Sequence, residues 1–317
     1  MSPSYRKINY SLRPAKHVER KMIFESLRRL SQLSKLEEYQ YIGFGSVYFA
    51  DFRLAHKGLG IDALTSVERD GNHRARFEFN RPYRCVNIEY GESTRILPTL
   101  SWEKPAILWL DYDGKLDLDV LTDIRTFVVE ARPGSVVIVS VNVQGLKDPA
   151  KSSLDDLIRR VGSEKVPVGT TEKDLRSWGA AAIERRIIQN EIEENLAGRN
   201  GPLPPNQKVS YRQLYNFHYA DDARMLTTGG LLFSESQRAD VDRCSFEDFG
   251  YIRSADDATE IVVPRLTHKE IKHLDHQLPK ATGAKSKTIQ APGIPSEDVD
   301  AYAAVYRYFP SFAEAEF

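Results

Sequence analysis

Short apolar runs alternate with amphipathic stretches along the middle of the chain. The run Gly134–Val139 shows almost no alternation of polar and apolar side chains, which is typical of a strand covered on both faces. Strands are predicted near residues 39–44, 62–68, 85–89, 106–111 and 135–143, with helical stretches between them. This order predicts an α/β fold in which a parallel sheet is wound with helices.

After the fifth predicted strand the pattern becomes long, charged and helical. A capping box of Thr171 and Asp174 predicts a helix that continues to the Gly-Pro-rich residues 200–205. Two β-rich runs follow, at residues 209–219 and 225–233, and are expected to pair antiparallel. The core is therefore interrupted by a helical insertion and ends in a hairpin.

Both ends of the chain lie outside this core. Apolar residues three or four apart predict a helix over His17–Leu33 in the basic amino-terminal part. The carboxy-terminal part holds a linker near residues 280–295 and a final helix from about Ser296, whose aromatic end at Tyr308–Pro310 is expected to dock on the body. The predicted units are a basic helical segment 1–38, a core 39–144 with 207–236, a helical insertion 145–206 and an extension 237–317.

The end of the first predicted strand carries the most informative residues. Gly43 and Gly45, within Tyr41–Ser46, let the backbone turn sharply where a side chain would occupy a ligand's space. Glu68 ends the next strand about 25 residues later, near the spacing of about 20 at which a carboxylate accepts hydrogen bonds from a ribose diol. The pair predicts a nucleotide-binding βαβ unit. A tight turn beside an ordinary surface Glu68 is the alternative.

Two later strands also end in polar clusters. Gly91–Ser93 follows the third predicted strand and Asp111–Gly114 follows the fourth, and ligands of parallel sheets collect at such carboxyl ends. Alternate residues of an extended segment point the same way, so Asp111 and Asp113 could face the cleft together as base or orienting group. Lys115 could lower the pKa of either acid. A turn that closes a strand explains the same acids.

Composition narrows the class of protein. The 44 basic and 45 acidic residues nearly cancel, which argues against coating nucleic acid by bulk electrostatics but leaves room for local basic patches. Cys85 and Cys244 fit no CxxC or other metal spacing and are too few for a disulfide framework, which favours a reducing compartment. No run approaches the roughly 18 apolar residues of a membrane span. We therefore expect a soluble, cytoplasmic protein.

Five parallel strands with a terminal hairpin, a glycine turn after the first strand and acids ending the second and fourth resemble the class I S-adenosylmethionine-dependent methyltransferases. The resemblance implies a Rossmann-like, mostly parallel seven-stranded sheet with S-adenosylmethionine as cofactor. It also implies that the glycine turn lies under the methionine and ribose portions, that Glu68 holds the ribose hydroxyls and that Asp111–Gly114 faces the sulfonium and the acceptor. The predicted cofactor-binding residues are Gly43, Phe44, Gly45, Ser46, Glu68, Arg69, Glu92, Ser93, Asp111 and Tyr112, and the predicted catalytic residues are Asp111, Asp113 and Lys115.

The sequence departs from this family at several positions. Val47 stands where the usual motif has a third small residue, and Tyr41 stands where an acid is common. The chain lacks the Asn/Asp-Pro-Pro-Tyr/Phe segment of DNA amino-methylating enzymes, and neither cysteine adjoins a proline as in cytosine-C5 enzymes. What remains resembles O-methyltransferases, which bind a divalent cation partly through an Asp-Asn pair after strand five. Asn142 matches the Asn, but Val141 replaces the Asp, so a divalent metal is not expected.

The acceptor is not identified by the sequence beyond an oxygen or nitrogen atom. Cations and aromatic rings after the first two strands would suit a nucleotide or RNA, although a solvated helix face explains them equally well. These residues are Tyr48, Arg53, Arg74, Arg76, Arg81, Tyr83 and Arg84. Arg13 and Lys16 are similarly candidates to bind an anion, with a solvated face paired to Glu19 and Glu25 as the alternative.

Two other classes of function fit parts of the same sequence. Asp111, Asp113 and Lys115, with Glu89 upstream, also match the metal and lysine set of a restriction-type nuclease. Alternatively, the domain binds nucleotide or protein partners without catalysis. In that case the helical insertion could carry a homodimer or partner face.

Overall fold

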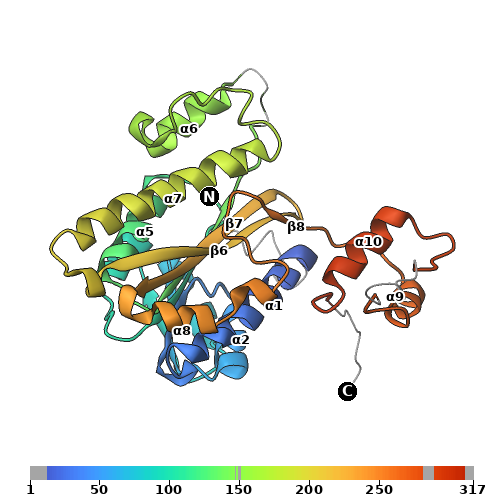
Figure 1. Ribbon diagram of the computed structural model, residues 1–317, viewed down its shortest axis with the longest axis horizontal. Helices are drawn as coiled ribbons and strands as arrows, with labels where there is room; N and C mark the ends of the chain where they lie inside the picture. Colours follow the sequence, from blue (N-terminus) through green and yellow to red (C-terminus); the bar gives the residue numbers. More distant parts are fainter. Residues whose placement is uncertain (1–12, 147, 149–150, 281–288, 311–317) are drawn as a thin grey trace.

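The computed structural model describes residues 13–146, 148, 151–280 and 289–310 (Figure 1), so residues 281–288 of the predicted linker lie outside the described part. Eight strands in the described part form one sheet in the order β3-β2-β1-β4-β5-β7-β6-β8. Their bounds are β1 Gln40–Gly43, β2 Ala63–Glu68, β3 Val86–Tyr90, β4 Ala106–Asp111, β5 Val136–Asn142, β6 Val209–Ala220, β7 Arg224–Ser234 and β8 Thr259–Ile261.

The strand directions confirm the predicted Rossmann-like methyltransferase fold. β1 to β5 run parallel, and β7 runs antiparallel to both β5 and β6, which makes β6 and β7 the predicted hairpin. The sheet has one strand more than predicted, because Thr259–Ile261 pairs parallel to Phe217–Tyr219 at the edge. Three residues are shorter than the usual strand of about five or six, so the hydrophobic pattern alone gave little sign of β8.

Helices cover both faces of the sheet (Figure 1). Their bounds are α1 Pro14–Leu27, α2 Ala50–Leu59, α3 Arg74–Asn80, α4 Ser93–Ile96, α5 Leu118–Glu130, α6 Ser153–Val161, α7 Gly179–Asn200, α8 Arg238–Arg243, α9 His268–Asp275 and α10 Ser296–Val305. α1, α2 and α8 pack on the face that presents Tyr41, Trp109 and Phe217. α5 and α7 pack on the opposite face. None of these helices combines the length and apolar character needed to cross a membrane.

The helical insertion begins its long helix later than predicted. The backbone N–H and the hydroxyl of Thr171 donate to Asp174 at 2.8 and 2.7 Å, so the capping contact forms. The helix nevertheless starts only at Gly179, because Ser177 adopts a left-handed conformation with φ of 51°. α7 then packs along α5 and buries an isoleucine stripe within this chain: Ile187, Ile188 and Ile192.

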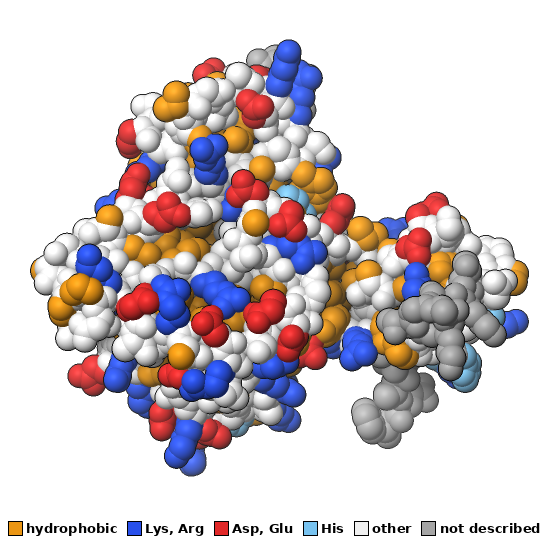
Figure 2. Space-filling view, viewed as in Figure 1, with side chains coloured by type: hydrophobic (Ala, Val, Ile, Leu, Met, Phe, Trp, Pro, Cys, Tyr) orange, Lys and Arg blue, Asp and Glu red, His pale blue; other side chains and the backbone are white. Residues whose placement is uncertain are grey.

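A small carboxy-terminal module stands beside the body (Figure 1). α9 and α10 share their own apolar cluster around Leu274 and Tyr302. The aromatic end docks on the body as expected, since the ring of Tyr308 meets Tyr251 edge-on at 5.8 Å and the carbonyl of Phe309 accepts from Lys21. A cleft of about 1240 Å³ lies between module and body, where Figure 2 shows hydrophobic side chains gathered at the junction.

We predict that Gly230→Ala destabilises the sheet by about 1–3 kcal/mol. A Cβ on Gly230 would lie 2.1 Å from the backbone oxygen of Arg212 in β6, so the two strands would have to separate. Gly58→Ala is the matched control, because a Cβ there has open space within α2 and should stabilise by about 0.5–1 kcal/mol. Urea unfolding of both variants checks this, and equal stability of the two would contradict it.

Candidate functional site

The glycine turn after β1 is held tightly against β2. The backbone N–H of Gly45 donates to the Ser66 hydroxyl at 3.0 Å. A Cβ on Gly45 would lie 2.6 Å from both that hydroxyl and the ring of Phe49, so no side chain fits there. Ser46 follows with φ of 50°, and its hydroxyl is buried with no hydrogen-bond partner in the described part of the chain. The turn is therefore compact and leaves one polar group available.

Glu68, at the end of β2, lies against this turn. Its Oε1 accepts a hydrogen bond from the Ser66 hydroxyl at 2.7 Å, and only 7% of the residue is exposed. Burial raises the pKa of Glu68 to about 7, although the Ser66 hydroxyl and the N–H groups of Ser46 and Gly45 oppose the increase. The structure thus brings the predicted glycine turn and the predicted acid together in one place.

Aromatic and hydroxyl groups gather beside the turn. The ring of Tyr112 meets the ring of Phe44 edge-on at 5.0 Å, and its hydroxyl lies 3.2 Å from the Ser93 hydroxyl. The Tyr112 hydroxyl also donates to Asp123 of α5. Burial raises the pKa of Asp123 to about 6, opposed by the hydrogen bonds from Ser93 and Tyr112. Three predicted cofactor residues, Phe44, Ser93 and Tyr112, therefore form one cluster.

Asp111 forms an ion pair with a lysine of α1. The ammonium of Lys16 is fully buried and lies 2.6 Å from Asp111, 2.8 Å from Glu19 and 3.3 Å from the hydroxyl of Ser140. It also lies 4.6 Å above the ring of Trp109. Lys16 is thus neither a solvated surface residue nor available to bind an external anion.

The charges around Lys16 fix the ionisation of Asp111. Burial alone would raise the pKa of Asp111, but the ammonium of Lys16 and the guanidinium of Arg20 outweigh it and hold that pKa below its usual value. Burial raises the pKa of Glu19, with Lys16 opposing, so Glu19 takes up a proton before Asp111 does. A carboxylate with a low pKa is a weak base. Asp111 is therefore suited to orienting charge rather than to accepting a proton.

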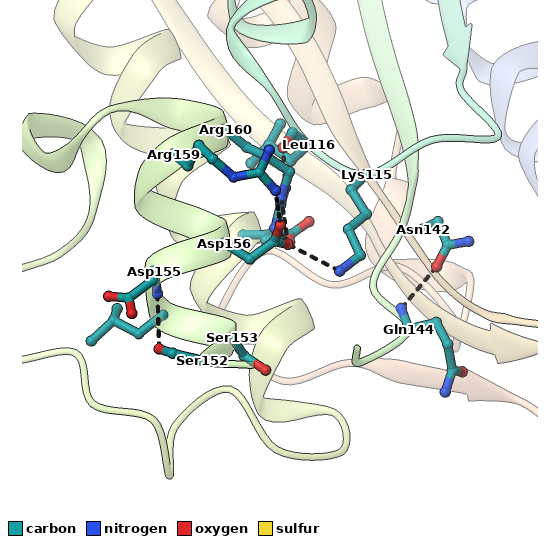
Figure 3. A network of polar contacts seen from close by, with 12 residues as sticks. Lys115, Leu116, Asn142, Gln144, Ser152, Ser153, Asp155, Asp156, Arg159 and Arg160 are labelled. Atoms are coloured by element: carbon teal, nitrogen blue, oxygen red, sulfur yellow. Dashed lines mark hydrogen bonds and ion pairs between the residues drawn. The ribbon is translucent and has the colours of Figure 1, made fainter. Parts of the chain in front are cut away.

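Lys115 pairs with an acid of the helical insertion rather than with Asp111. Figure 3 shows it extended from the loop after β4 toward Asp156 on α6, at 3.2 Å. Asp156 also pairs with Arg159 and Arg160, and Arg160 donates to the backbone oxygen of Leu116. These contacts fasten the insertion to the loop that follows Asp111. They leave the ammonium of Lys115 engaged with Asp156. Glu89 is exposed on β3, which is separated from β4 by both β2 and β1, so the nuclease set is not assembled.

The other predicted residues lie nearer to solvent. Arg69, Glu92 and Asp113 are exposed. Val141 and Asn142 occupy the positions of the metal-binding Asp-Asn pair of O-methyltransferases. Asn142 accepts a hydrogen bond from the backbone N–H of Gln144 at 2.8 Å, and Val141 is buried in the apolar core.

The cationic and aromatic residues that were proposed to bind an acceptor lie in different parts of the structure. Arg74 stacks on Tyr90 at 4.3 Å, near the carboxyl ends of β2 and β3. Tyr48 packs in the same region with Phe77. Tyr83 and Arg84 instead precede β3 and lie at the amino-terminal ends of the strands, away from Arg74 and Tyr90. The set therefore does not form one surface.

Sequence reasoning named Lys16 and Glu19 but expected them at the surface, and it did not single out Asp123; the structure buries all three. Lys16 and Glu19 lie three residues apart, and Arg20 completes the same side of α1, where all three are buried. Asp123 interrupts the apolar face of α5 in the same way. A charged residue within an otherwise buried helical face was the available signal, but it does not identify the partner across the sheet.

The family of the protein follows from a match over nearly its whole length. Residues 8–317 match the model of a family described as "Putative O-methyltransferase". The chain belongs to this family, and so to the methyltransferase superfamily that its sequence resembled. No match is found among the curated proteins.

Solved structures offer more distant likenesses. LepI, in complex with S-adenosylhomocysteine and a substrate analogue, is 14% identical with a TM-score of 0.33, and the match covers 62% of this chain but 43% of LepI. The O-methyltransferase TomG of Streptomyces achromogenes, in complex with S-adenosylmethionine, is 15% identical with a TM-score of 0.36, covering 66% of this chain and 79% of TomG. An O-methyltransferase from Bacillus cereus is 15% identical with a TM-score of 0.34, covering 65% and 79%.

We predict that Lys16→Met destabilises the protein by about 3–5 kcal/mol, because the buried Glu19 and the largely buried Asp111 then lose their shared cation. Adding Asp111→Asn should restore part of that loss. Lys57→Met, on the exposed side of α2, is the control and should change stability by less than about 0.5 kcal/mol. Urea unfolding measures all three variants. Equal effects at Lys16 and Lys57 would show that the buried pair does not support the fold.

Proposed function

We propose that this protein transfers a methyl group from S-adenosylmethionine to an oxygen atom of an acceptor. The observation that carries the proposal is the buried Glu68 held against a glycine turn at the carboxyl edge of the sheet. The family match supports oxygen as the receiving atom. When bound, the cofactor supplies a methyl carbon: its bond to sulfur breaks as the bond to oxygen forms, the electron pair stays on sulfur, and the acceptor's proton leaves.

The residues at the turn fit such a cofactor. The unpartnered Ser46 hydroxyl can bind a polar group of the ligand. Glu68, once ionised, would accept hydrogen bonds from the ribose hydroxyls, and Phe44 and Tyr112 would offer ring surfaces for the adenine. Gly45 keeps the backbone free of a side chain.

The residues at the ends of β4 and β5 do not fit a divalent cation. Val141 offers no ligand, and Lys16 places an ammonium 2.6 Å from Asp111. Lys16 instead holds Asp111 ionised and in position, where its negative charge would attract the positive sulfonium of a bound cofactor. Asp113, exposed two residues further along, would accept the acceptor's proton.

The acceptor would reach this region through the cleft beside the carboxy-terminal module. Asp221 in the cleft wall accepts the backbone N–H of Lys16 at 3.2 Å, and the ammonium of the same lysine binds Asp111. Rings and cations line the wall, which suits a planar acceptor with an anionic substituent, such as a nucleotide. These lining residues are Tyr302, Tyr306, Phe309, Arg265 and Lys272.

Calorimetric titration with S-adenosylhomocysteine tests the cofactor site. Glu68→Gln should weaken binding about tenfold to a hundredfold, because the charge-assisted hydrogen bonds to the ribose are lost. Glu89→Gln, on the neighbouring strand and exposed, is the matched control and should leave binding unchanged. Unchanged affinity in Glu68→Gln would refute the assignment. Binding without methyl transfer to any phenol or nucleotide offered would support the non-catalytic alternative instead.

We also predict that cofactor affinity rises with pH and levels off above about 7. The free protein holds Glu68 largely protonated below about pH 7, whereas the ribose requires the carboxylate. Affinity should therefore fall about tenfold per pH unit below that value. The same shift affects the folding stability of the free protein in the opposite direction. Protonated Glu68 contributes fully to the free energy of unfolding below its ordinary pKa of 4.5, and this contribution is lost as the pH rises through about 7. Titrations with S-adenosylhomocysteine across this range measure the first effect, and a slope that persists in Glu68→Gln would assign it to another group.

A further inference from the structure

Three potential metal ligands from different segments lie close together at the amino-terminal ends of the strands. Glu68 lies at the opposite, carboxyl end of β2. His56 lies in α2, Asp62 directly precedes β2, and Cys85 directly precedes β3. The Nδ1 of His56 lies 3.0 Å from Asp62 Oδ1 and 3.8 Å from Cys85 Sγ. β2 separates Asp62 from Glu68 by roughly 20 Å. The cluster is therefore distinct from the proposed cofactor site.

Hydrogen bonding alone accounts poorly for this convergence. The backbone oxygen of Ile61 also lies 3.2 Å from the Nδ1 of His56, so a carboxylate, a carbonyl and a thiol all approach one nitrogen. That nitrogen carries at most one proton to share among them. A cation would interact favourably with all four groups at once.

The spacing and chemistry of the ligand atoms suit zinc. Tetrahedral zinc with bonds of about 2.0–2.3 Å places neighbouring ligand atoms roughly 3.3–3.6 Å apart. The two measured separations, 3.0 and 3.8 Å, lie within a few tenths of an ångström of that range. Thiolate and imidazole together favour zinc over magnesium or calcium. Asp62 is exposed, which gives the ion access from solvent.

The surroundings hold the imidazole in place. The ring of Tyr83 packs on His56 with centroids 4.4 Å apart. Zinc binds cysteine as the thiolate, so binding displaces the proton of the Cys85 thiol. Binding should consequently strengthen as pH rises.

We infer that His56, Asp62 and Cys85 bind a structural zinc ion that joins α2 to the starts of β2 and β3. Water or the carbonyl of Ile61 would complete the coordination. The spacing of these residues matches no common zinc motif, which is why the sequence alone gave no sign of it.

Titration with Co²⁺, followed by visible and near-ultraviolet absorption, tests this inference. The native protein should bind one equivalent and show a thiolate-to-cobalt charge-transfer band, which Zn²⁺ then abolishes. Cys85→Ser should lose the band, whereas Cys244→Ser should retain it because that cysteine is buried in the core at the end of α8. No band in the native protein, or a band that survives in Cys85→Ser, would overturn the site.

A second variant protects the test against misfolding. Asp62→Asn changes an exposed side chain, so it should fold normally and keep the charge-transfer band while its affinity falls at least tenfold. Zn²⁺ should raise the Tm of the native protein and of Cys244→Ser, but not that of Cys85→Ser. Equal affinity in Asp62→Asn and the native protein would remove Asp62 from the site and overturn the three-ligand assignment.

Discussion

The buried contact between Lys16 and Asp111 is the interaction on which the candidate site depends. An ammonium with no solvent exposure is tolerated only where its lost hydration is replaced. Asp111, Glu19, Ser140 and the ring of Trp109 together provide that replacement. Since Lys16 lies in α1 and Asp111 ends β4, the amino-terminal helix is part of the site rather than an appendage.

This contact also changes the chemistry expected of the fourth strand. An aspartate at such a position could bind a metal or accept a proton. Here Lys16 occupies the place beside Asp111 where a cation would lie and lowers its pKa. In the proposed reaction Asp111 therefore acts through its charge, and a different group accepts the proton. Val141 provides no second acid, and Lys16 lies where a metal ion would bind. Both features therefore point to a site that works without a metal ion beside Asp111.

The sequence was sufficient for seven of the eight strands of the described sheet and for the approach of Glu68 to the turn at Gly45. Both depend on local rules: unbroken apolar runs for covered strands, and a glycine turn followed by an acid at a fixed distance. The position of Lys16 could not be predicted in the same way, because it depends on which helix covers the end of β4. The capping contact at Thr171 shows the limit of local rules, since the contact forms but the helix begins after Ser177.

The three segments outside the core converge on the same edge of the sheet. α1 reaches it through Lys16, and α6 reaches it through Asp156, which binds Lys115 in the loop after β4. The carboxy-terminal module forms one wall of the cleft whose other wall contains Asp221 in the turn between β6 and β7. A core sheet of this kind presents an open edge to solvent, where an acceptor and water have equal access. Three added segments border this end of the sheet, so in the proposed reaction they would contribute more than the sheet itself to the shape of the acceptor site.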